Sequence, residues 1–188
     1  MKPKADEAIS FLDEVLSTSG GEGVSSCIQC GVCSASCPNA ARMDYSPRRT
    51  IALIRAGERK RVLTSNSPWI CATCYMCTVR CPRDVKPTEL MHALERLAVR
   101  HNLRSRKVST PEMYGSFISS IKKNGRVHEV GMMMDYYLKT NPVAALRIAP
   151  VGMKLFTRGR MAMKASKIKG AGQLQAMIDK AQTLGGEQ

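Results

Sequence analysis

The chain has 188 residues, 44% of them apolar and only 5% aromatic, and its formal charge is +14. This length allows one compact domain with an extension, and no stretch approaches the roughly 20 apolar residues that span a bilayer. The polar first residues carry no apolar signal core, so we expect a cytoplasmic protein.

The first expected helix runs from about Lys4 to Leu16. Its apolar side chains recur with the period of a helix, and they are Ile9, Leu12, Val15 and Leu16. The Ser- and Gly-rich segment that follows, residues 17–21, is expected to be a loop.

A second helix is expected to begin at Pro47, because proline is favoured at the first helical position and Ser46 is a candidate N-cap. Gly57 is a candidate helix end. The apolar side of this helix would consist of Ile51, Leu53 and Ile54.

A third helix is expected from about Thr88 to His101, with Thr88 as its N-cap. Its apolar residues again have helical spacing, and they are Leu90, Leu94, Leu97 and Ala98. Together these elements predict a first domain over residues 1–105.

Residues 106–188 form a second region, with helices expected near Pro111–Lys123, Gly131–Thr140 and Ala171–Thr183. Within it, residues 136–178 contain no Asp or Glu, and six of the twelve methionines lie between 132 and 163. The same stretch carries eight basic residues: Lys139, Arg147, Lys154, Arg158, Arg160, Lys164, Lys167 and Lys169.

We interpret this basic, Met-rich region as a helical extension that docks on a partner protein, because methionine side chains adapt to partner surfaces. A solvated face is one alternative, and a membrane or nucleic-acid surface is another. We do not expect nucleic acid or a membrane as partner.

All eight cysteines belong to two copies of one pattern, CxxCxxCxxxCP, which are 44 residues apart. The first copy comprises Cys27, Cys30, Cys33 and Cys37, followed by Pro38; the second comprises Cys71, Cys74, Cys77 and Cys81, followed by Pro82. This spacing is typical of cubane iron–sulfur sites. Zinc sites usually use separated cysteine pairs, and disulfides are rare in the cytosol. We therefore predict two [4Fe–4S] clusters.

In such runs the fourth cysteine ligates the other cluster. Cluster 1 is thus expected to bind Cys27, Cys30, Cys33 and Cys81. Cluster 2 is expected to bind Cys71, Cys74, Cys77 and Cys37. With the clusters in place, the net charge falls to about +10, which favours acidic partner surfaces.

Five apolar residues between the ligands are expected to keep water away from the sulfurs: Ile28, Val32, Ala72, Met76 and Val79. Arg80 and Arg83 either raise the potential of the nearby cluster or are ordinary surface residues. Trp69 is expected to cover the second cysteine loop.

No catalytic residue is expected. His92, His101 and His128 are scattered, and each is interpreted as an ordinary helix residue. The sequence also lacks a dinucleotide fingerprint, a P-loop and a nucleophile elbow. The chain is therefore interpreted as an electron relay without a substrate site.

Four further segments carry a family resemblance. They are the Ser-Pro-Arg-Arg-Thr-Ile helix between the cysteine runs, the segment Ser-Pro-Trp-Ile before the second run, the Pro-Thr-Glu-Leu helix that begins at Pro87, and Ala-Ala-Leu-Arg-Ile-Ala-Pro-Val-Gly-Met-Lys-Leu-Phe near the C-terminus. Together with the two runs they resemble the C subunit of heterodisulfide reductase. The resemblance implies a mainly α fold: an α-helical ferredoxin-type domain with two cluster-binding loops, followed by a helical extension.

The resemblance also implies a function. Such a protein is the non-catalytic electron-transfer part of an oxidoreductase, and it passes electrons from a flavin-containing A subunit to a B subunit with CCG repeats. In methanogenesis this B subunit then cleaves the disulfide of coenzyme M and coenzyme B. A hydrogenase or a formate dehydrogenase can join the complex.

Two other functions stay open at the level of the sequence. One is a free ferredoxin-like carrier, although the chain is longer and more basic than is typical of carriers. The other is the iron–sulfur subunit of a different, membrane-associated dehydrogenase. The helical iron–sulfur core is shared with fumarate reductase and anaerobic glycerol-3-phosphate dehydrogenase, but the additional cysteine sets of those proteins are missing from this chain.

Overall fold

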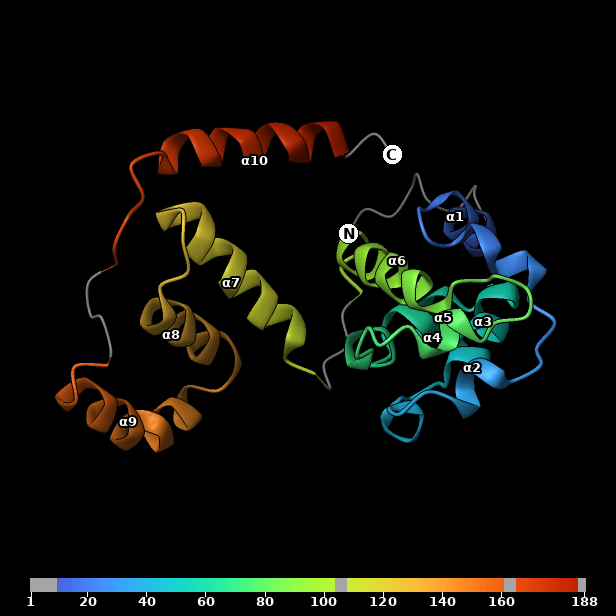
Figure 1. Cartoon of the computed structure of the whole chain (residues 1–188), viewed down its shortest axis with the longest axis horizontal. Coiled ribbons are helices and arrows are strands. Elements are labelled where there is room, and N and C mark those ends of the chain that lie inside the picture. The colour runs from blue at the N-terminus through green and yellow to red at the C-terminus, as the bar shows by residue number, and fades with distance from the viewer. Residues whose placement is uncertain (1–9, 104–107, 161–164, 186–188) are drawn as a thin grey trace. The chain divides into compact units, whose positions relative to one another are not determined.

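The computed structural model describes residues 10–103, 108–160 and 165–185, which are helical without any strand among them (Figure 1). The chain divides into two compact units, residues 1–108 and 109–188. The boundary expected between residues 105 and 106 lies outside the described residues.

The first unit is built from short helices joined by tight turns. Its α-helices are α1 (Phe11–Ser17), α2 (Val32–Ala35), α3 (Pro47–Arg55), α4 (Arg59–Leu63), α5 (Met76–Val79) and α6 (Pro87–Arg100). Three 3₁₀ turns complete it: η1 (Glu22–Ser26), η2 (Ala40–Arg42) and η3 (Pro68–Ile70).

The first helix starts later than the apolar pattern predicts. Residues 4–9 of the expected helix lie outside the described residues, and α1 begins at Phe11 because Ser10 is its N-cap. The Ser10 hydroxyl accepts a hydrogen bond from the Asp13 backbone N–H at 3.1 Å and donates to the Asp13 carboxylate at 2.7 Å. This exchange fixes an extended backbone at Ser10, so the prediction of a continuous helix through this position is wrong.

The helices α3 and α6 lie where the sequence predicts, and α3 ends before Gly57, which has a φ of +74°. Ser46 occupies the N-cap position of α3 as predicted, but its side chain makes no capping hydrogen bond. The prediction of Thr88 as the N-cap of α6 is wrong, because Thr88 lies inside that helix and Lys86 is at the N-cap position.

The caps come instead from the two cysteine loops. The hydroxyl of Ser34 accepts from the Arg48 N–H of α3 at 2.9 Å, and the hydroxyl of Thr78 accepts from the Thr88 N–H of α6 at 3.3 Å. Each hydroxyl residue directly follows the third cysteine of its run. The 44-residue repeat therefore includes the cap of the helix that follows each loop.

The core of the first unit surrounds α6. The predicted apolar residues Leu90, Leu94, Leu97 and Ala98 are all fully buried, together with Ile51 and Ile54 of α3 and Val15 of α1. Each buried aliphatic side chain of this size contributes about 1.5–3 kcal/mol. Cys27, Cys71 and Cys81 are half-buried against this core, which therefore supports both cysteine loops from behind.

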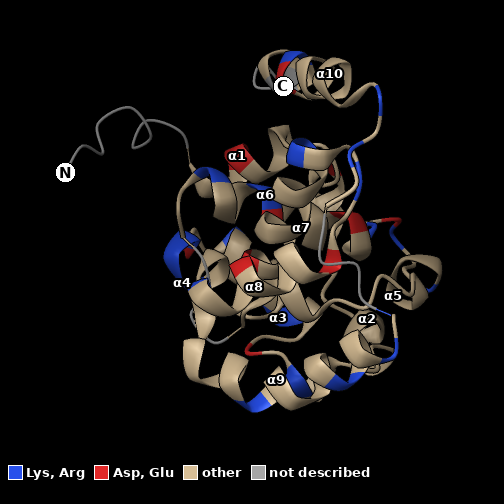
Figure 2. Ribbon diagram, turned by 90° about the vertical axis from the view of Figure 1, so that its left-hand side faces the viewer, with Lys and Arg blue, Asp and Glu red and all other residues tan. Residues whose placement is uncertain are grey.

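The second unit consists of α7 (Thr110–Asn124), α8 (Glu129–Thr140), α9 (Pro142–Thr157) and α10 (Ala171–Gly185). Three of these helices are close to the predicted ones. The sequence did not predict α9, because Pro150 lies inside it. In the ribbon of Figure 2, α9 carries Lys and Arg positions and no Asp or Glu position. No helix in the described ranges is long and apolar enough to cross a membrane.

The second unit buries little apolar surface. Among its described residues the buried ones are Pro111, Ser116, Ser120 and Asn124, all on α7. Ser116 donates a hydrogen bond to the Asp135 carboxylate at 2.6 Å, and Ser120 accepts one from the His128 N–H at 2.9 Å. Polar contacts thus join α7 to α8, while most large apolar side chains of this unit stay exposed.

Candidate iron–sulfur sites

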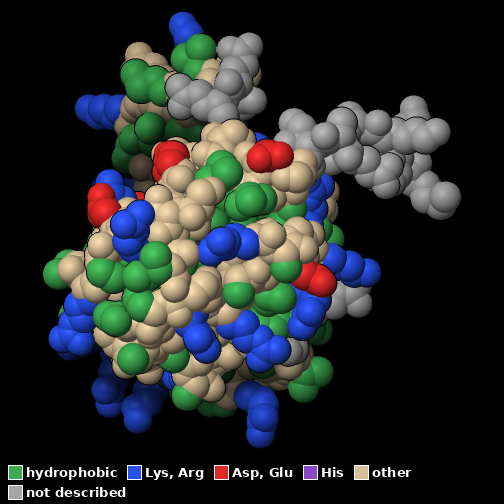
Figure 3. All heavy atoms as spheres, turned by 90° about the vertical axis from the view of Figure 1, so that its right-hand side faces the viewer, with side chains coloured by type: hydrophobic (Ala, Val, Ile, Leu, Met, Phe, Trp, Pro, Cys, Tyr) green, Lys and Arg blue, Asp and Glu red, His purple; other side chains and the backbone are tan. Residues whose placement is uncertain are grey.

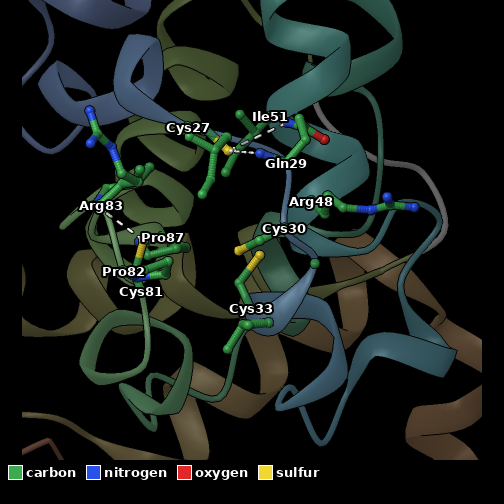
Figure 4. A pocket seen from close by; sticks show the side chains of 14 residues that line it. Cys27, Gln29, Cys30, Cys33, Arg48, Ile51, Cys81, Pro82, Arg83 and Pro87 are labelled. Carbon is green, nitrogen blue, oxygen red and sulfur yellow. Dashed lines mark hydrogen bonds between the residues drawn. The ribbon is translucent and has the colours of Figure 1, made fainter.

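The eight cysteines line two hollows of similar size in the first unit. The first hollow, with about 350 Å³ of space partly open to solvent, is lined by Cys27, Cys30, Cys33 and Cys81. The second hollow, with about 370 Å³, is lined by Cys37, Cys71, Cys74 and Cys77. Figure 4 shows the first hollow, with the sulfurs of Cys30 and Cys33 directed toward each other near its centre.

The two loops repeat one backbone conformation. In each, a 3₁₀ turn ends at the first cysteine, and a four-residue helix carries the third cysteine (α2 with Cys33, α5 with Cys77). The residues two and four positions after the first cysteine have positive φ: Gln29 (58°), Gly31 (85°), Thr73 (51°) and Tyr75 (60°). These left-handed positions bend each loop around one hollow, so that the first three cysteines of the run lie on the same side of that hollow.

Hydrogen bonds position Cys37 at the second hollow. The Asn39 side chain donates to the Ile70 carbonyl at 2.7 Å, directly before Cys71. Further along, the Asp44 N–H donates to the Asn66 side chain at 2.6 Å and the Asn66 N–H donates back to the Asp44 carboxylate at 2.9 Å. The segment after Cys37 is therefore fastened to the segment before the second run.

A close backbone approach positions Cys81 at the first hollow. A Cβ atom built on Gly23, in η1, would lie 2.9 Å from the Cα of Val85. The Arg83 side chain also donates to the Ser26 carbonyl at 3.3 Å. The segment after Cys81 is thereby held against the turn that precedes Cys27.

Several donors are directed at the sulfurs. The Gln29 and Val85 N–H groups donate to the Sγ atoms of Cys27 and Cys81, both at 3.4 Å. The Thr88 hydroxyl lies 3.4 Å from the Sγ of Cys77. Such donors stabilise negative charge on sulfur, and in a cluster site they raise the reduction potential.

Three of the thiols resist ionisation in the protein alone. Burial raises the pKa of Cys33, Cys37 and Cys71, and neighbouring thiols add to the effect. For Cys37 these neighbours are Cys77 and Cys74, both of the other run. Iron binds thiolates, so loading a cluster here must release protons and supply positive charge that offsets this repulsion.

Three of the five apolar residues expected to shield the sulfurs line the hollows: Ile28 and Val32 the first, and Ala72 the second. Met76 and Val79 are in neither lining. All five are exposed in this chain on its own, with Val79 at 82% and Ile28 at 60%. Water is excluded from behind the loops by the core, to which Trp69 also belongs, with 8% of its surface exposed.

The histidines make polar contacts within the unit in which they lie. His92 lies 3.3 Å from the Thr73 hydroxyl and 3.3 Å from the Glu95 carboxylate, and His128 caps α8 by accepting from the Gly131 N–H. His101 forms a short contact with Glu14, which also pairs with Arg59 at 2.8 Å. Glu14 of α1 is thereby joined to the end of α6 through His101 and to α4 through Arg59.

Sequence reasoning missed several residues that shape the hollows. Asn39, Asn66 and Ser67 act by polar contacts across more than 20 residues of chain, which no local pattern signals. Gly23, which was missed as well, does have a local signal. A glycine so close to a cysteine run indicates a close approach of two backbone segments.

The arrangement of donors suits clusters. Among the described residues, no three His, Cys, Asp or Glu side chains gather closely enough for a single metal ion. The thiols instead surround two hollows, and a cubane binds each of its thiolates at a different iron.

Known proteins share the cysteine region. Residues 23–85 match the family described as 4Fe-4S dicluster domain. The chain is 40% identical over 87 residues to the C subunit of the ferredoxin:CoB-CoM heterodisulfide reductase of Methanosarcina acetivorans, covering 46% of this chain and 35% of that protein. It is 42% identical over 77 residues to an iron-sulfur C subunit of the CoB–CoM heterodisulfide reductase of Methanocaldococcus jannaschii, covering 41% of each.

A third relative is a C subunit of the H(2)/formate:CoB-CoM heterodisulfide,ferredoxin reductase of Methanococcus maripaludis, 47% identical over 73 residues, or 39% of each chain. The chain spans less than half the length of these curated relatives. Within that span the cysteine region agrees with the geometry of the two hollows. Residues 23–85 therefore match a 4Fe–4S dicluster domain of ferredoxin type, and this part of the chain is related to the C subunits of heterodisulfide reductases.

Proposed function

We propose that the chain holds two [4Fe–4S] clusters with crossed ligands. Cluster 1 is bound by Cys27, Cys30 and Cys33 with Cys81, and cluster 2 by Cys71, Cys74 and Cys77 with Cys37. The observation that carries this proposal is that each hollow is lined by three cysteines of one run and the fourth cysteine of the other. When bound, such clusters supply one-electron redox chemistry.

The chain's own residues position the thiols and direct hydrogen bonds at them, as the contacts of Gln29, Val85 and Thr88 indicate. No residue of the chain is assigned a catalytic role. The chain acts as a relay, and its redox partners are other proteins.

We further propose that the relay belongs to a heterodisulfide reductase complex. In this complex it passes electrons from a flavin-containing A subunit to the CCG-repeat B subunit, which cleaves the coenzyme M–coenzyme B disulfide in methanogenesis. The similarity to three proteins named as C subunits supports this assignment. The names of these relatives also contain ferredoxin, H₂ and formate, which supports a hydrogenase or formate dehydrogenase as a further partner.

The second unit is proposed to dock on a partner protein of the complex. Support comes from α9, whose large apolar side chains are exposed: Val143, Leu146, Ile148, Val151, Met153, Leu155 and Phe156. A helix that is apolar on nearly all sides is normally buried, so a partner surface is the expected cover. Met161, Met163 and Lys164 of the expected docking stretch lie outside the described residues.

The ligand assignment is tested with a matched pair of variants. Anaerobically prepared protein should contain about eight iron and eight sulfide per chain. Cys81→Ala should perturb the spectrum of the cluster bound by the first run, and Cys37→Ala that of the cluster bound by the second. Zinc without sulfide would overturn the clusters, and the reverse pattern of damage would overturn the crossing.

The place in a complex is tested by purifying the tagged full chain anaerobically and identifying the proteins that accompany it. A flavoprotein together with a CCG-repeat protein would support the heterodisulfide reductase assignment. A lone chain that exchanges electrons with several enzymes would instead indicate a free carrier. Co-purification with a membrane-associated dehydrogenase would support the remaining alternative.

A further inference from the structure

The two hollows have the same ligand pattern but different charges around them. The residues that line the first hollow include Arg48 and Arg83 and no Asp or Glu. The residues that line the second hollow include no charged side chain.

The two arginines lie on the rim of the first hollow. The side-chain stem of Arg48 crosses the loop at Gly31, where a Cβ atom would lie 3.6 Å from the Arg48 Cδ. Arg83 is anchored by its hydrogen bond to the Ser26 carbonyl. Figure 4 shows both guanidinium groups directed away from the sulfurs, on either side of the hollow.

A third arginine adds to the positive charge here. Arg55 donates to the Cys27 carbonyl at 2.8 Å, so its charge is fixed beside the first ligand of the run. Asp84 follows Arg83 but is not among the residues that line the hollow. The first hollow thus has three arginines about it, and the second has none in its lining.

Exposed apolar side chains complete this rim. Ile28 is 60% exposed and Val32 38% exposed, and Cys30 between them is itself exposed. Among the side chains visible in Figure 3, Lys and Arg are many and Asp and Glu few, in keeping with the formal charge of +14. An apolar centre with a charged rim is the usual composition of a protein–protein contact.

We propose that the first hollow is the face at which this chain exchanges electrons with an acidic redox partner, with Arg48 and Arg83 as the residues that guide docking. The partner is a protein that carries carboxylates around its own redox centre. Opposite charges raise the rate of encounter and fix the orientation, and the exposed Ile28 and Val32 become buried on contact. The inference rests on the proposed function, because it requires a redox group in the first hollow.

The test uses the holo full-length chain and two small redox probes of opposite charge. The reduced protein is mixed anaerobically with Fe(III)–EDTA, which is singly negative, or with hexaamminecobalt(III), which is triply positive. In each reaction one electron leaves the protein and reduces Fe(III) to Fe(II) or Co(III) to Co(II). The rate is followed by stopped-flow absorbance at low ionic strength.

The variants are Arg48→Glu and Arg83→Glu, and the control is Arg49→Glu. Arg49 is the neighbour of Arg48 on α3 and is also exposed, but its guanidinium lies over the Tyr45 ring, 5.2 Å from the ring centre. All three variants change the net charge equally. With the probe at roughly 10 Å from the arginine, each reversal of charge at the rim should slow the reaction of Fe(III)–EDTA by about twofold to fourfold. The triply charged hexaamminecobalt(III) should react faster by about the cube of that factor, roughly tenfold to sixtyfold. The control should change either rate much less.

A second comparison separates the two hollows. Arg48→Gln and Ala72→Glu each lower the net charge by one, and Ala72 lines the second hollow. Only Arg48→Gln should slow Fe(III)–EDTA clearly. Equal effects of Arg48→Glu and Arg49→Glu, or a larger effect of Ala72→Glu, would overturn the docking face.

Iron and sulfide are measured on every variant. If every variant keeps its full iron and sulfide, and the rim and control variants change the electron-transfer rates equally, the docking face is refuted and the proposed function is not. Absence of iron and sulfide in the unaltered chain refutes the proposed function instead, so the two failures are distinguishable.

Discussion

Gly23 controls the distance between the two segments that form the first hollow. A Cβ at this position would lie 2.9 Å from the Val85 Cα, 3.1 Å from the Val85 carbonyl oxygen and 3.3 Å from the Asp84 carbonyl oxygen. Non-bonded carbon atoms pack at about 3.5–4.0 Å, so Gly23→Ala must move the backbones apart by roughly 0.6–1 Å. The neighbours are backbone atoms, which cannot rotate away.

The displacement should act on one cluster site. Val85 donates its N–H to Cys81, and Gly23 precedes Cys27, so separating them pulls two ligands of the first hollow apart. The contacts that place Cys37 at the second hollow lie elsewhere, through Asn39 and Asn66. We expect a cost of about 1–3 kcal/mol in stability, which is typical of overpacking.

The assay combines chemical analysis with spectroscopy of the anaerobic holo-protein. Gly23→Ala should lose iron and sulfide toward about four of each, and the remaining spectrum should match that of Cys81→Ala. The control is Gly115→Ala, where no atom lies within 4 Å of the new Cβ. That variant lies within α7 and should be neutral or stabilising by up to about 1 kcal/mol. Unchanged iron content and stability in Gly23→Ala would refute the reasoning.

Three other predictions concern local features. Tyr75→Gly should stabilise the protein by about 1 kcal/mol in thermal unfolding, because Tyr75 is 43% exposed and its φ of 60° is strained for any residue with a Cβ; a lower midpoint would contradict this. Thr78→Val should cost about 1 kcal/mol through loss of the α6 cap, whereas Thr64→Val, which removes a hydroxyl exposed after α4, should cost less. The hydrogen bonds from Lys139 and then Ser116 lower the pKa of Asp135, so its stabilisation is present above the ordinary pKa of Asp and is lost as pH falls through the lowered value. Ser116→Ala should raise this pKa in an NMR titration of the carboxyl group, and an unchanged value would exclude the contact.

Much of the first unit followed from the sequence because its signals are local. The period of Leu90, Leu94, Leu97 and Ala98 predicts the buried side of α6, and those four residues are fully buried. Pro47 predicts the start of α3, since proline needs no N–H partner there and has a suitable φ. The eight cysteines define the chemistry by type and spacing alone, because few other sites need that pattern.

The errors arose where the deciding partner is distant in the chain. The caps of α3 and α6 come from Ser34 and Thr78, which lie 14 and 10 residues before the N–H groups that they accept. Ser46 and Thr88 are of the residue type that usually caps a helix start. The cysteine loops, however, place another hydroxyl acceptor at the start of each helix. Val79, which was expected at the sulfurs, lies outside the lining of both hollows for a related reason, since apolar character does not reveal which side of a loop faces the ligands.

The sequence by itself indicated the candidate ligands, their crossed pairing, the helical class and the basic character of the second region, because each depends on residue type and short spacing. Only the tertiary structure showed how the crossed cysteines are held at one hollow, through contacts of Asn39, Asn66 and Gly23. It also decided that arginines border one hollow and not the other. Both depend on contacts between segments roughly 20–60 residues apart, where geometry is fixed by packing and hydrogen bonds rather than by any local pattern.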